Sequence, residues 1–407
     1  MSEGVPAAAI RDEACLGDLA PGPEERWPFY DEDEIAAAVG VLGSGKVNQW
    51  TGPDVFEFEK ECARRFGGGH GIAVANGSVA LELALRALGI GPGDEVVVTP
   101  RSFAASAFCA MLVGATPVFA DVDAESGNVT AETIERVLTG RTRAIIPVHL
   151  AGWPADMPAI MALAERRGVK VIEDCAQAHG AAIGGRSVGS FGDAAAFSFC
   201  QDKIISTAGE GGFASFRDAD AFEAAWSFKD HGKDRSRAMS PSSDPGEFRW
   251  LHDRPGTNWR LTGPQAAIGL VQLGKLDSWV EARTRNAAIW AEELGGISAI
   301  RIPFPGPELR HAYYKFYFQL ALPGDEAAGA RSRLLRRAAE EGLRLFSGSC
   351  SEIYREAAFD GLPTPDCPVA RLLGKISLMV EVHPTLDPDR LRQRAKRLAN
   401  IAREVLG

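Results

Sequence analysis

The sequence predicts an α/β protein with two parts: a large domain built on a mostly parallel, mixed sheet covered by helices, and a smaller C-terminal α+β domain. Short β-rich runs alternate with helical patterns between residues 72 and 216, which is typical of a parallel sheet. The last two runs, AAAFSF and GGFASF, have no helix between them, so one antiparallel strand is expected. A chain of 407 residues with 45% hydrophobic content can bury a large core and is long for one domain.

The pattern divides the chain into three segments. Residues 1–26 are rich in Pro, Gly and acidic residues, and we expect an N-terminal arm that can move. Residues 27–260 form the expected large domain, with the strand runs IAVA, EVVVT, PVFADV, RAIIPVHL and VKVIED before the two runs named above. The polar stretch 231–258 is long and unlike a packed element, which indicates a lid or an interface loop.

Residues 261–407 form the expected small domain. Two helical patterns, TGPQAAIGLVQLGKL and SWVEARTRNAAIWAEEL, precede the strand runs YKFYFQLAL and KISLMVEV. The last helical pattern, PDRLRQRAKRLANIAREVL, mixes basic and apolar residues. We interpret its basic side as the solvated face of a packed helix rather than as an interaction surface.

Composition excludes several classes of protein. A net charge of −10 leaves no global positive field for nucleic acid or for an anionic membrane. The longest apolar stretch, 104–120, is interrupted and short for a membrane span, and the acidic N-terminus does not resemble a secretory signal. The seven cysteines form no CxxC pair, and the seven histidines form no HExxH or Cys/His cluster. We therefore expect a cytoplasmic protein with no metal site and with no nucleic-acid or membrane partner.

Lys203 and Asp174 are the strongest candidates for chemistry. Lys203 follows an apolar strand run, in a loop that ends in glycines, and a deprotonated amine there could form a Schiff base. Asp174 follows the run VKVIE, so its carboxylate should project from the carboxyl edge of the sheet, where α/β ligand sites open. Taken alone, a loop lysine is usually a solvated charge, and Asp174 could equally cap a turn or helix.

Further candidates follow the strand runs. Gly77 and Ser78 stand where IAVA turns into a helical pattern, so they could cradle a phosphate or simply form an N-cap. No complete GxGxxG or GxxxxGK[ST] motif is present there, which argues against a dinucleotide or ATP. Phe103 could stack on a flat cofactor, although core packing is commoner. Ser198 could add a hydroxyl to the phosphate, and Gln177 lies close in sequence to the candidate aspartate.

Together these motifs resemble the DegT group of sugar aminotransferases, which are fold-type I enzymes dependent on pyridoxal 5'-phosphate (PLP). The resemblance runs from about residue 44 to the end. It rests on seven blocks that occur in order: SGKVNQWTGPDVFEFEKECARRFG, VANGSVALELAL, IIPVHLAGWPADM, EDCAQAHGA, GDAAAFSFCQDK, GEGG and GTNWRLTGPQAAIGLVQL.

The resemblance implies a role for each candidate residue and PLP as the cofactor. Lys203 would be the Schiff-base lysine, Asp174 would pair with the pyridinium nitrogen, and Gln177 would approach the phenolic oxygen. Phe103 would stack on the ring. The groups that would hold the phosphate are Gly77, Ser78, Ser198 and, from the neighbouring subunit, Asn258. A homodimer with shared active sites is therefore implied.

The function implied by the resemblance is transfer of an amino group from glutamate or glutamine to the keto group of a nucleotide-linked sugar, in aminosugar biosynthesis for polysaccharides or antibiotics. A dehydratase branch of the group carries histidine at the lysine position, and Lys203 argues against that branch. The family often shows SFHxxK, whereas Cys200, Gln201 and Asp202 precede the lysine here.

Three alternatives remain. Gln201 leaves open a ketocyclitol aminotransferase of antibiotic biosynthesis, of the scyllo-inosose type. A non-catalytic regulator with the PLP fold, fused to a DNA-binding module, is less favoured because too few residues precede Trp27 for such a module and the charge is acidic. A nicotinamide or methyl-donor enzyme lacks its glycine fingerprint.

Overall fold

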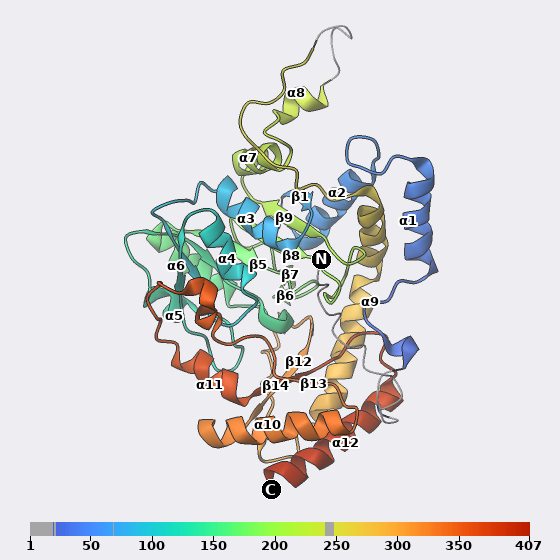
Figure 1. Cartoon of the computed structure of the whole chain (residues 1–407), viewed down its shortest axis with the longest axis vertical. Coiled ribbons are helices and arrows are strands. Elements are labelled where there is room, and N and C mark those ends of the chain that lie inside the picture. The colour runs from blue at the N-terminus through green and yellow to red at the C-terminus, as the bar shows by residue number, and fades with distance from the viewer. Residues whose placement is uncertain (1–18, 20–21, 68, 241–247) are drawn as a thin grey trace, which may run out of the picture.

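The structure is a computed structural model that describes residues 19, 22–67, 69–240 and 248–407. Its centre is a seven-stranded sheet in the order β1-β9-β8-β5-β4-β2-β3 (Figure 1). Six of these strands run in one direction and β9 runs in the opposite direction, so the mixed, mostly parallel sheet predicted from the sequence is confirmed. The strands are β1 (His70–Val74), β2 (Glu95–Val98), β3 (Thr116–Phe119), β4 (Thr142–Ile146), β5 (Lys170–Asp174), β8 (Ala194–Ser198) and β9 (Gly212–Phe216).

Helices cover both faces of this sheet. Successive residues of a strand point to opposite faces, and accordingly Ile72 and Val74 belong to one buried cluster while Ala73 belongs to another. The helices α3 (Gly77–Ala87), α4 (Ala105–Leu112) and α7 (Ala219–Lys229) pack together on one face. The other face is covered by α2 (Asp54–Phe66) and α9 (Gly263–Leu294), with α1 (Glu32–Ser44) along α9. The remaining helices of this part are α5 (Ala131–Glu135) and α6 (Met157–Arg167), and α6 packs on β5.

The helix α9 differs from expectation, because the two predicted helical patterns form one helix of 32 residues. It begins at a capping box made by Thr262 and Gln265. No proline interrupts its interior, and the helix continues through Gly269 and Gly274 although each glycine costs about 1 kcal/mol relative to alanine. Its first part packs on α1 and α2 and its last part on α12 (Pro388–Leu406), so it runs through both parts of the chain (Figure 1).

The C-terminal part is built on a four-stranded antiparallel sheet. In sheet order, its strands are β10 (Ile300–Arg301), β12 (Phe316–Leu320), β14 (Ser377–Val380) and β13 (Leu345–Phe346). Its helices are α10 (Gly324–Glu340), α11 (Pro368–Ile376) and α12. A separate three-stranded sheet consists of β11 (Leu309–Arg310), β6 (Ala182–Ile183) and β7 (Arg186–Ser187). The described residues also form short 3-10 helices: η2 (Pro23–Glu25), η3 (Leu150–Gly152), η4 (Ile353–Arg355) and η5 (Ala357–Phe359).

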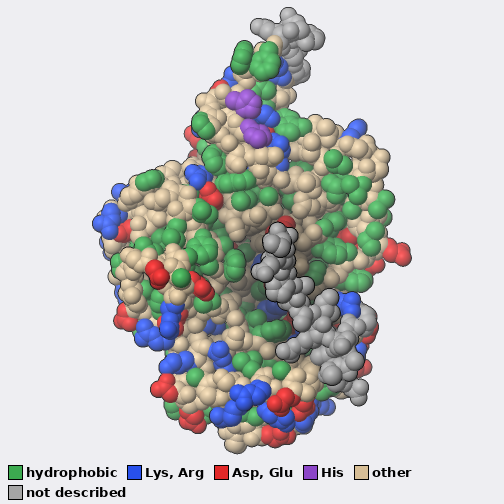
Figure 2. Space-filling view, in the orientation of Figure 1, with side chains coloured by type: hydrophobic (Ala, Val, Ile, Leu, Met, Phe, Trp, Pro, Cys, Tyr) green, Lys and Arg blue, Asp and Glu red, His purple; other side chains and the backbone are tan. Residues whose placement is uncertain are grey.

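The basic side of α12 is neutralised by neighbouring carboxylates. Arg397 pairs with Glu341, and Arg392 pairs with Glu292 at 2.7 Å. Figure 2 shows basic and acidic side chains interspersed at the end of the molecule that the C-terminal part forms. The structure therefore agrees with the interpretation of this surface as a solvated helix face.

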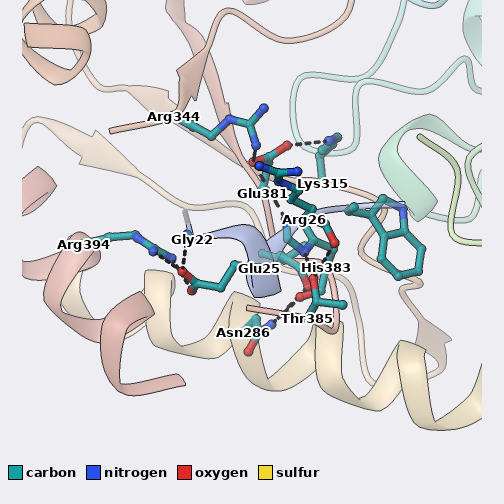
Figure 3. A network of polar contacts seen from close by, with 12 residues as sticks. Gly22, Glu25, Arg26, Asn286, Lys315, Arg344, Glu381, His383, Thr385 and Arg394 are labelled. Atoms are coloured by element: carbon teal, nitrogen blue, oxygen red, sulfur yellow. Dashed lines mark hydrogen bonds and ion pairs between the residues drawn. The ribbon is translucent and has the colours of Figure 1, made fainter. Parts of the chain in front are cut away.

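The predicted N-terminal arm and the 231–258 loop lie partly outside the described residues. Where the arm is described, Glu25 is buried and accepts hydrogen bonds from Arg394 of α12 at 2.6 and 2.8 Å (Figure 3). The 231–258 loop, which carries α8 (Arg235–Met239), projects from the body of the molecule (Figure 1). Its role as a lid or interface stays a prediction. No helix among the described residues has the length and apolar character needed to cross a bilayer.

Candidate active site

A cavity of about 420 Å³ opens where β5 and β8 end and α3 begins. Its walls include residues that lie more than a hundred positions apart in sequence. Seven of the eight predicted site residues line it: Gly77, Ser78, Phe103, Asp174, Gln177, Ser198 and Lys203. Parallel strands bring these side chains together because their carboxyl ends meet at one edge of the sheet.

Asp174 is the last residue of β5 and is 4% exposed. One carboxylate oxygen, Oδ2, accepts a hydrogen bond from the Ser106 hydroxyl at 2.7 Å, and Oδ1 accepts one from the Ala176 N–H at 3.1 Å. Burial raises the pKa of Asp174, while the Ser106 hydrogen bond acts in the opposite direction. Asp174 thus stabilises a turn and also presents a carboxylate to the cavity.

Lys203 lies in the loop after β8, and its side chain is 17% exposed. Its Nζ atom is 3.4 Å from Asp202 Oδ1 and 5.0 Å from the centroid of the Tyr314 ring. The indole N–H of Trp27 donates a hydrogen bond of 2.9 Å to the Lys203 carbonyl. The amine therefore has a carboxylate and an aromatic ring as immediate neighbours, and the backbone that carries it is fixed.

Asp202 and Tyr314 form a pair that sequence reasoning missed. The Tyr314 hydroxyl donates a hydrogen bond to Asp202 Oδ2. Burial would raise the pKa of Asp202, but the charge of Lys203 and the Tyr314 hydrogen bond outweigh burial and lower it. Asp202 was visible only as a departure from the family motif, and Tyr314 looked like a strand residue. Their separation of 112 positions left no local signal.

A buried arginine contacts the backbone of Tyr314, one member of the Asp202–Tyr314 pair. Arg283 of α9 is 1% exposed and donates a hydrogen bond from Nη1 to the Tyr314 carbonyl at 3.2 Å. Its guanidinium lies 4.9 Å from the centroid of the Trp27 ring. Burial lowers the pKa of Arg283 to about 9. The long helix and the N-terminal segment therefore both contact the surroundings of the candidate lysine.

The start of α3 can hold a phosphate. Asn76 is the N-cap, and its Oδ1 accepts a hydrogen bond from the Val79 N–H at 3.0 Å. Gly77 and Ser78 in the first turn line the cavity, and first-turn N–H groups at the positive end of a helix attract anions. A Cβ atom on Gly77 would lie 2.6 Å from Ser198 Cβ, so α3 can approach β8 this closely only with glycine.

Phe103 and Gln177 occupy other parts of the wall. Phe103 is 72% exposed, so it is not a core residue and its ring is available to a ligand. Gln177 Oε1 accepts a hydrogen bond from the Ala151 N–H at 2.8 Å, which leaves the Gln177 amide N–H groups as donors. An amine, a buried carboxylate, an exposed aromatic ring and a helix start with hydroxyl groups together match the chemical groups of PLP.

Asn258 is the predicted residue that the structure does not bring to this cavity. It is exposed and forms an isolated backbone bridge with Asp230 at the end of the 231–258 loop. Its contribution to the site of a neighbouring subunit stays a prediction.

One buried group of metal-ligand side chains exists among the described residues: His149, Glu173 and Cys175. His149 Nε2 lies 3.1 Å from Glu173 Oε2, and His149 Nδ1 accepts a hydrogen bond from the Ala155 N–H. The Glu173 carboxylate also accepts three backbone N–H groups from residues 189–192. Because these atoms are committed to hydrogen bonds, we assign the group a structural role.

Comparison with known proteins agrees with the resemblance seen in the sequence. The model of the DegT/DnrJ/EryC1/StrS aminotransferase family matches residues 28–398. UDP-N-acetyl-3-dehydro-alpha-D-glucosamine 3-aminotransferase of Acidithiobacillus ferrooxidans is 38% identical over 374 residues, which cover 92% of this chain and 94% of that protein. 3-Amino-5-hydroxybenzoate synthase of Amycolatopsis mediterranei is 36% identical over 342 residues, 84% of each protein. The solved aminotransferase from Psychrobacter cryohalolentis matches with a TM-score of 0.89 and 43% identity, over 94% of this chain and 99% of that one.

Proposed function

We propose a substrate class for this chain, which belongs to the DegT/DnrJ/EryC1/StrS aminotransferase family of PLP-dependent enzymes. It transfers an amino group from glutamate or glutamine to the keto group of a nucleotide-linked sugar. The observation that carries the aminotransferase part of this proposal is the presence of Lys203 and Asp174 in one cavity of about 420 Å³, together with the start of α3. The relative from Acidithiobacillus ferrooxidans, named for a UDP-linked 3-keto sugar, supports this substrate class.

Each residue of the cavity has a proposed role toward the cofactor. Lys203 would hold the cofactor through its amine, and the same amine, when free, would take up and release a proton. Asp174 would face the pyridine nitrogen of the cofactor, and Phe103 would contact its ring. When bound, PLP supplies an electron sink that lets a proton leave the carbon next to the amine. The groups proposed to hold its phosphate are Gly77, Ser78 and Ser198.

Asp202 and Tyr314 are proposed to position Lys203. The Asp202 carboxylate, 3.4 Å from Nζ, stabilises the amine whenever it has taken up a proton. The Tyr314 hydroxyl fixes that carboxylate by donating to its other oxygen. The pair therefore orients the lysine for proton transfer without itself contacting the reacting carbon.

Replacement of the lysine tests the assignment. In Lys203→Ala, we expect loss of the absorbance of the lysine-bound cofactor at about 410–430 nm and loss of turnover. The control is Lys60→Ala, because the Lys60 side chain is 80% exposed on α2, away from the cavity. Retained turnover in Lys203→Ala would refute the role of this lysine, whatever the substrate.

A substrate panel tests the acceptor. It contains UDP-, dTDP- and GDP-linked keto sugars and scyllo-inosose, and the ratio of kcat/KM values decides between them. We expect the largest value for a nucleotide-linked sugar, with the UDP-linked 3-keto sugar tried first. A larger value for scyllo-inosose would favour the ketocyclitol alternative that Gln201 leaves open.

The assembly is also part of the proposal. We propose a cytoplasmic homodimer in which Asn258 of each subunit contributes to the phosphate site of the other. Asn258 is exposed and outside the cavity of its own chain, as this arrangement requires. An Asn258→Ala variant should bind PLP more weakly without loss of the dimer in sedimentation, and a monomeric natural protein would contradict the shared site.

A further inference from the structure

A second cavity lies between the central sheet and the small-domain sheet. Its volume is about 40 Å³, and it shares no lining residue with the cofactor cavity. Its walls come from the loop after β2, from η3 and from β12, represented by Arg101, Leu150 and Tyr317. This volume corresponds to roughly three water-sized positions. A cavity of this size admits a small group such as a carboxylate.

Arg101 brings an uncompensated positive charge to this cavity. The residue is 2% exposed, and its Nε and Nη1 atoms have no hydrogen-bond partner among the described residues. The guanidinium lies 5.7 Å from the centroid of the Tyr317 ring, and the Tyr317 hydroxyl is occupied by Ser349. A buried guanidinium stays charged and is costly to leave without a counter-ion. The environment therefore favours an anion next to Arg101.

The protein does not supply that anion from the described walls. Glu125 is the carboxylate on the cavity wall, but it is 59% exposed and is paired with Arg301. No hydrogen bond joins it to Arg101 in this part of the chain. A second cation, Arg331, adds to the positive potential at Arg101.

His311 adds a neutral hydrogen-bond donor to the same wall. Its Nδ1 accepts a hydrogen bond of 2.8 Å from the Tyr313 N–H, so the ring proton is on Nε2. Burial lowers the pKa of His311 to about 3, which keeps the ring neutral. The cavity thus combines one cation with a donor of fixed tautomer, and this combination suits an oxyanion.

The cavity also adjoins the cofactor site. Ser102, the next residue after Arg101, lines the cofactor cavity. Ala151 lines the second cavity, and its N–H donates to Gln177, which lines the cofactor cavity. A ligand at Arg101 would therefore be separated from the cofactor cavity by the wall segment that contains Gln177.

We propose that this cavity binds a small carboxylate through Arg101 and His311. Two sources present this group: a free carboxylate ion, and the amino-acid donor, the latter resting on the function proposed above. One guanidinium and one neutral imidazole match the single negative charge of a carboxylate, whereas a phosphate group carries about two negative charges. The site differs from the cofactor phosphate site because it is formed by the large-domain loop and the small-domain sheet together.

Acetate and acetamide distinguish this site from a cavity that holds water alone. The two probes have the same shape, but only acetate carries charge. With the PLP-loaded natural chain, and ionic strength held constant with sodium chloride, acetate should raise the midpoint of thermal unfolding saturably, by about 2 °C or more. Acetamide should leave the midpoint unchanged. Equal responses to the two probes, or no response to acetate, would overturn the proposal without reference to any substrate.

Variants assign the response to the cavity. Arg101→Gln should lose the acetate-dependent shift, and Arg143→Gln should keep it, because the Arg143 side chain is 52% exposed and distant from the cavity walls. A persistent shift in Arg101→Gln would place the acetate elsewhere and contradict the proposal. If Arg101→Gln does not fold, the comparison of acetate with acetamide on the natural chain still decides.

Steady-state kinetics then distinguishes the two sources of the carboxylate. If acetate competes with the amino donor, and Arg101→Gln raises KM for the donor by about tenfold with KM for the keto substrate unchanged, the site receives the donor carboxylate. If the thermal shift occurs without such competition, the site receives a free carboxylate ion. Absence of aminotransferase activity would contradict the proposed function but leave the thermal result intact.

Discussion

Replacement of Gly77 by alanine tests whether the start of α3 is shaped by its contact with β8. The added Cβ atom would lie 2.6 Å from Ser198 Cβ and 3.1 Å from both Ser198 Cα and Oγ. Because backbone is involved, rotation of the serine side chain alone cannot relieve the contact. Either the first turn of α3 or the end of β8 must move.

The size of the effect follows from this distance. Ordinary van der Waals contact begins at 3.4 Å, so the first turn must retreat by about 0.8 Å. Overpacking of this kind costs about 1–3 kcal/mol of folding free energy. A displacement close to 1 Å of groups that hold a ligand can change the relevant equilibrium or rate by about 10- to 100-fold. We therefore expect Gly77→Ala to bind PLP at least about tenfold more weakly.

The assay is a PLP titration followed by absorbance, together with thermal unfolding of the enzyme without cofactor. The control is Gly274→Ala, since a Cβ atom at Gly274 meets nothing within 4 Å inside α9. The same chemical change should there stabilise the protein by about 0.4–1 kcal/mol. Unchanged PLP affinity and stability in Gly77→Ala would refute the inferred close approach.

Three other changes test the surroundings of the site. Tyr314→Phe removes the hydrogen bond to Asp202, so kcat should fall about tenfold with PLP affinity unchanged, and an unaltered kcat would contradict the positioning role. Burial raises the pKa of Glu59 to about 7 from its usual 4.5. The protonated Glu59 side chain therefore stabilises the fold fully below pH 4.5, and this stabilisation is lost as the pH rises through 7. In urea unfolding, Glu59→Gln should remove about 3 kcal/mol of the pH dependence of the unfolding free energy. Parallel pH profiles for the variant and the natural protein would refute this role of Glu59. Burial alone would raise the pKa of Glu25, but Arg394 helps lower it to about 2. Arg394→Met should lower the free energy of unfolding by about 3–5 kcal/mol at pH 7, and this loss should shrink as the pH falls from 4.5 through 2. Equal stability of the variant and the natural protein at pH 7 would contradict a stabilising Glu25–Arg394 pair.

Much of the fold could be predicted because it is encoded locally. The alternation of β-rich and helical patterns, and the missing helix before GGFASF, predicted the parallel strands and the antiparallel β9. The merging of two helical patterns into α9 was not predicted, because Gly274, Asp277 and Ser278 are residue types that often end or cap a helix, and tertiary packing overrides them here. The signal in the sequence for one continuous helix was that the helical spacing of apolar residues continues without interruption from one pattern into the other.

The site could be predicted only where residues follow strand ends. Lys203, Asp174 and Gly77 each lie just after a strand run, so sheet topology alone brings them to one edge. Tyr314 acts through Asp202, which lies 112 positions away in the sequence, and Arg101 is notable because two of its buried nitrogen atoms have no hydrogen-bond partner among the described residues. Neither property is visible in one sequence, because both depend on how the C-terminal part packs against the central sheet.

The continuous helix α9 constrains how the two parts of the enzyme can move. At 1.5 Å per residue, its 32 residues form a rod of about 48 Å. It is anchored to α1 and α2 at one end and to α12 at the other. A rod without a break supplies no hinge within α9, so a hinge between the two parts would have to lie elsewhere in the chain. Arg283, about two-thirds of the way along the rod, connects α9 to the tyrosine that flanks the reactive amine.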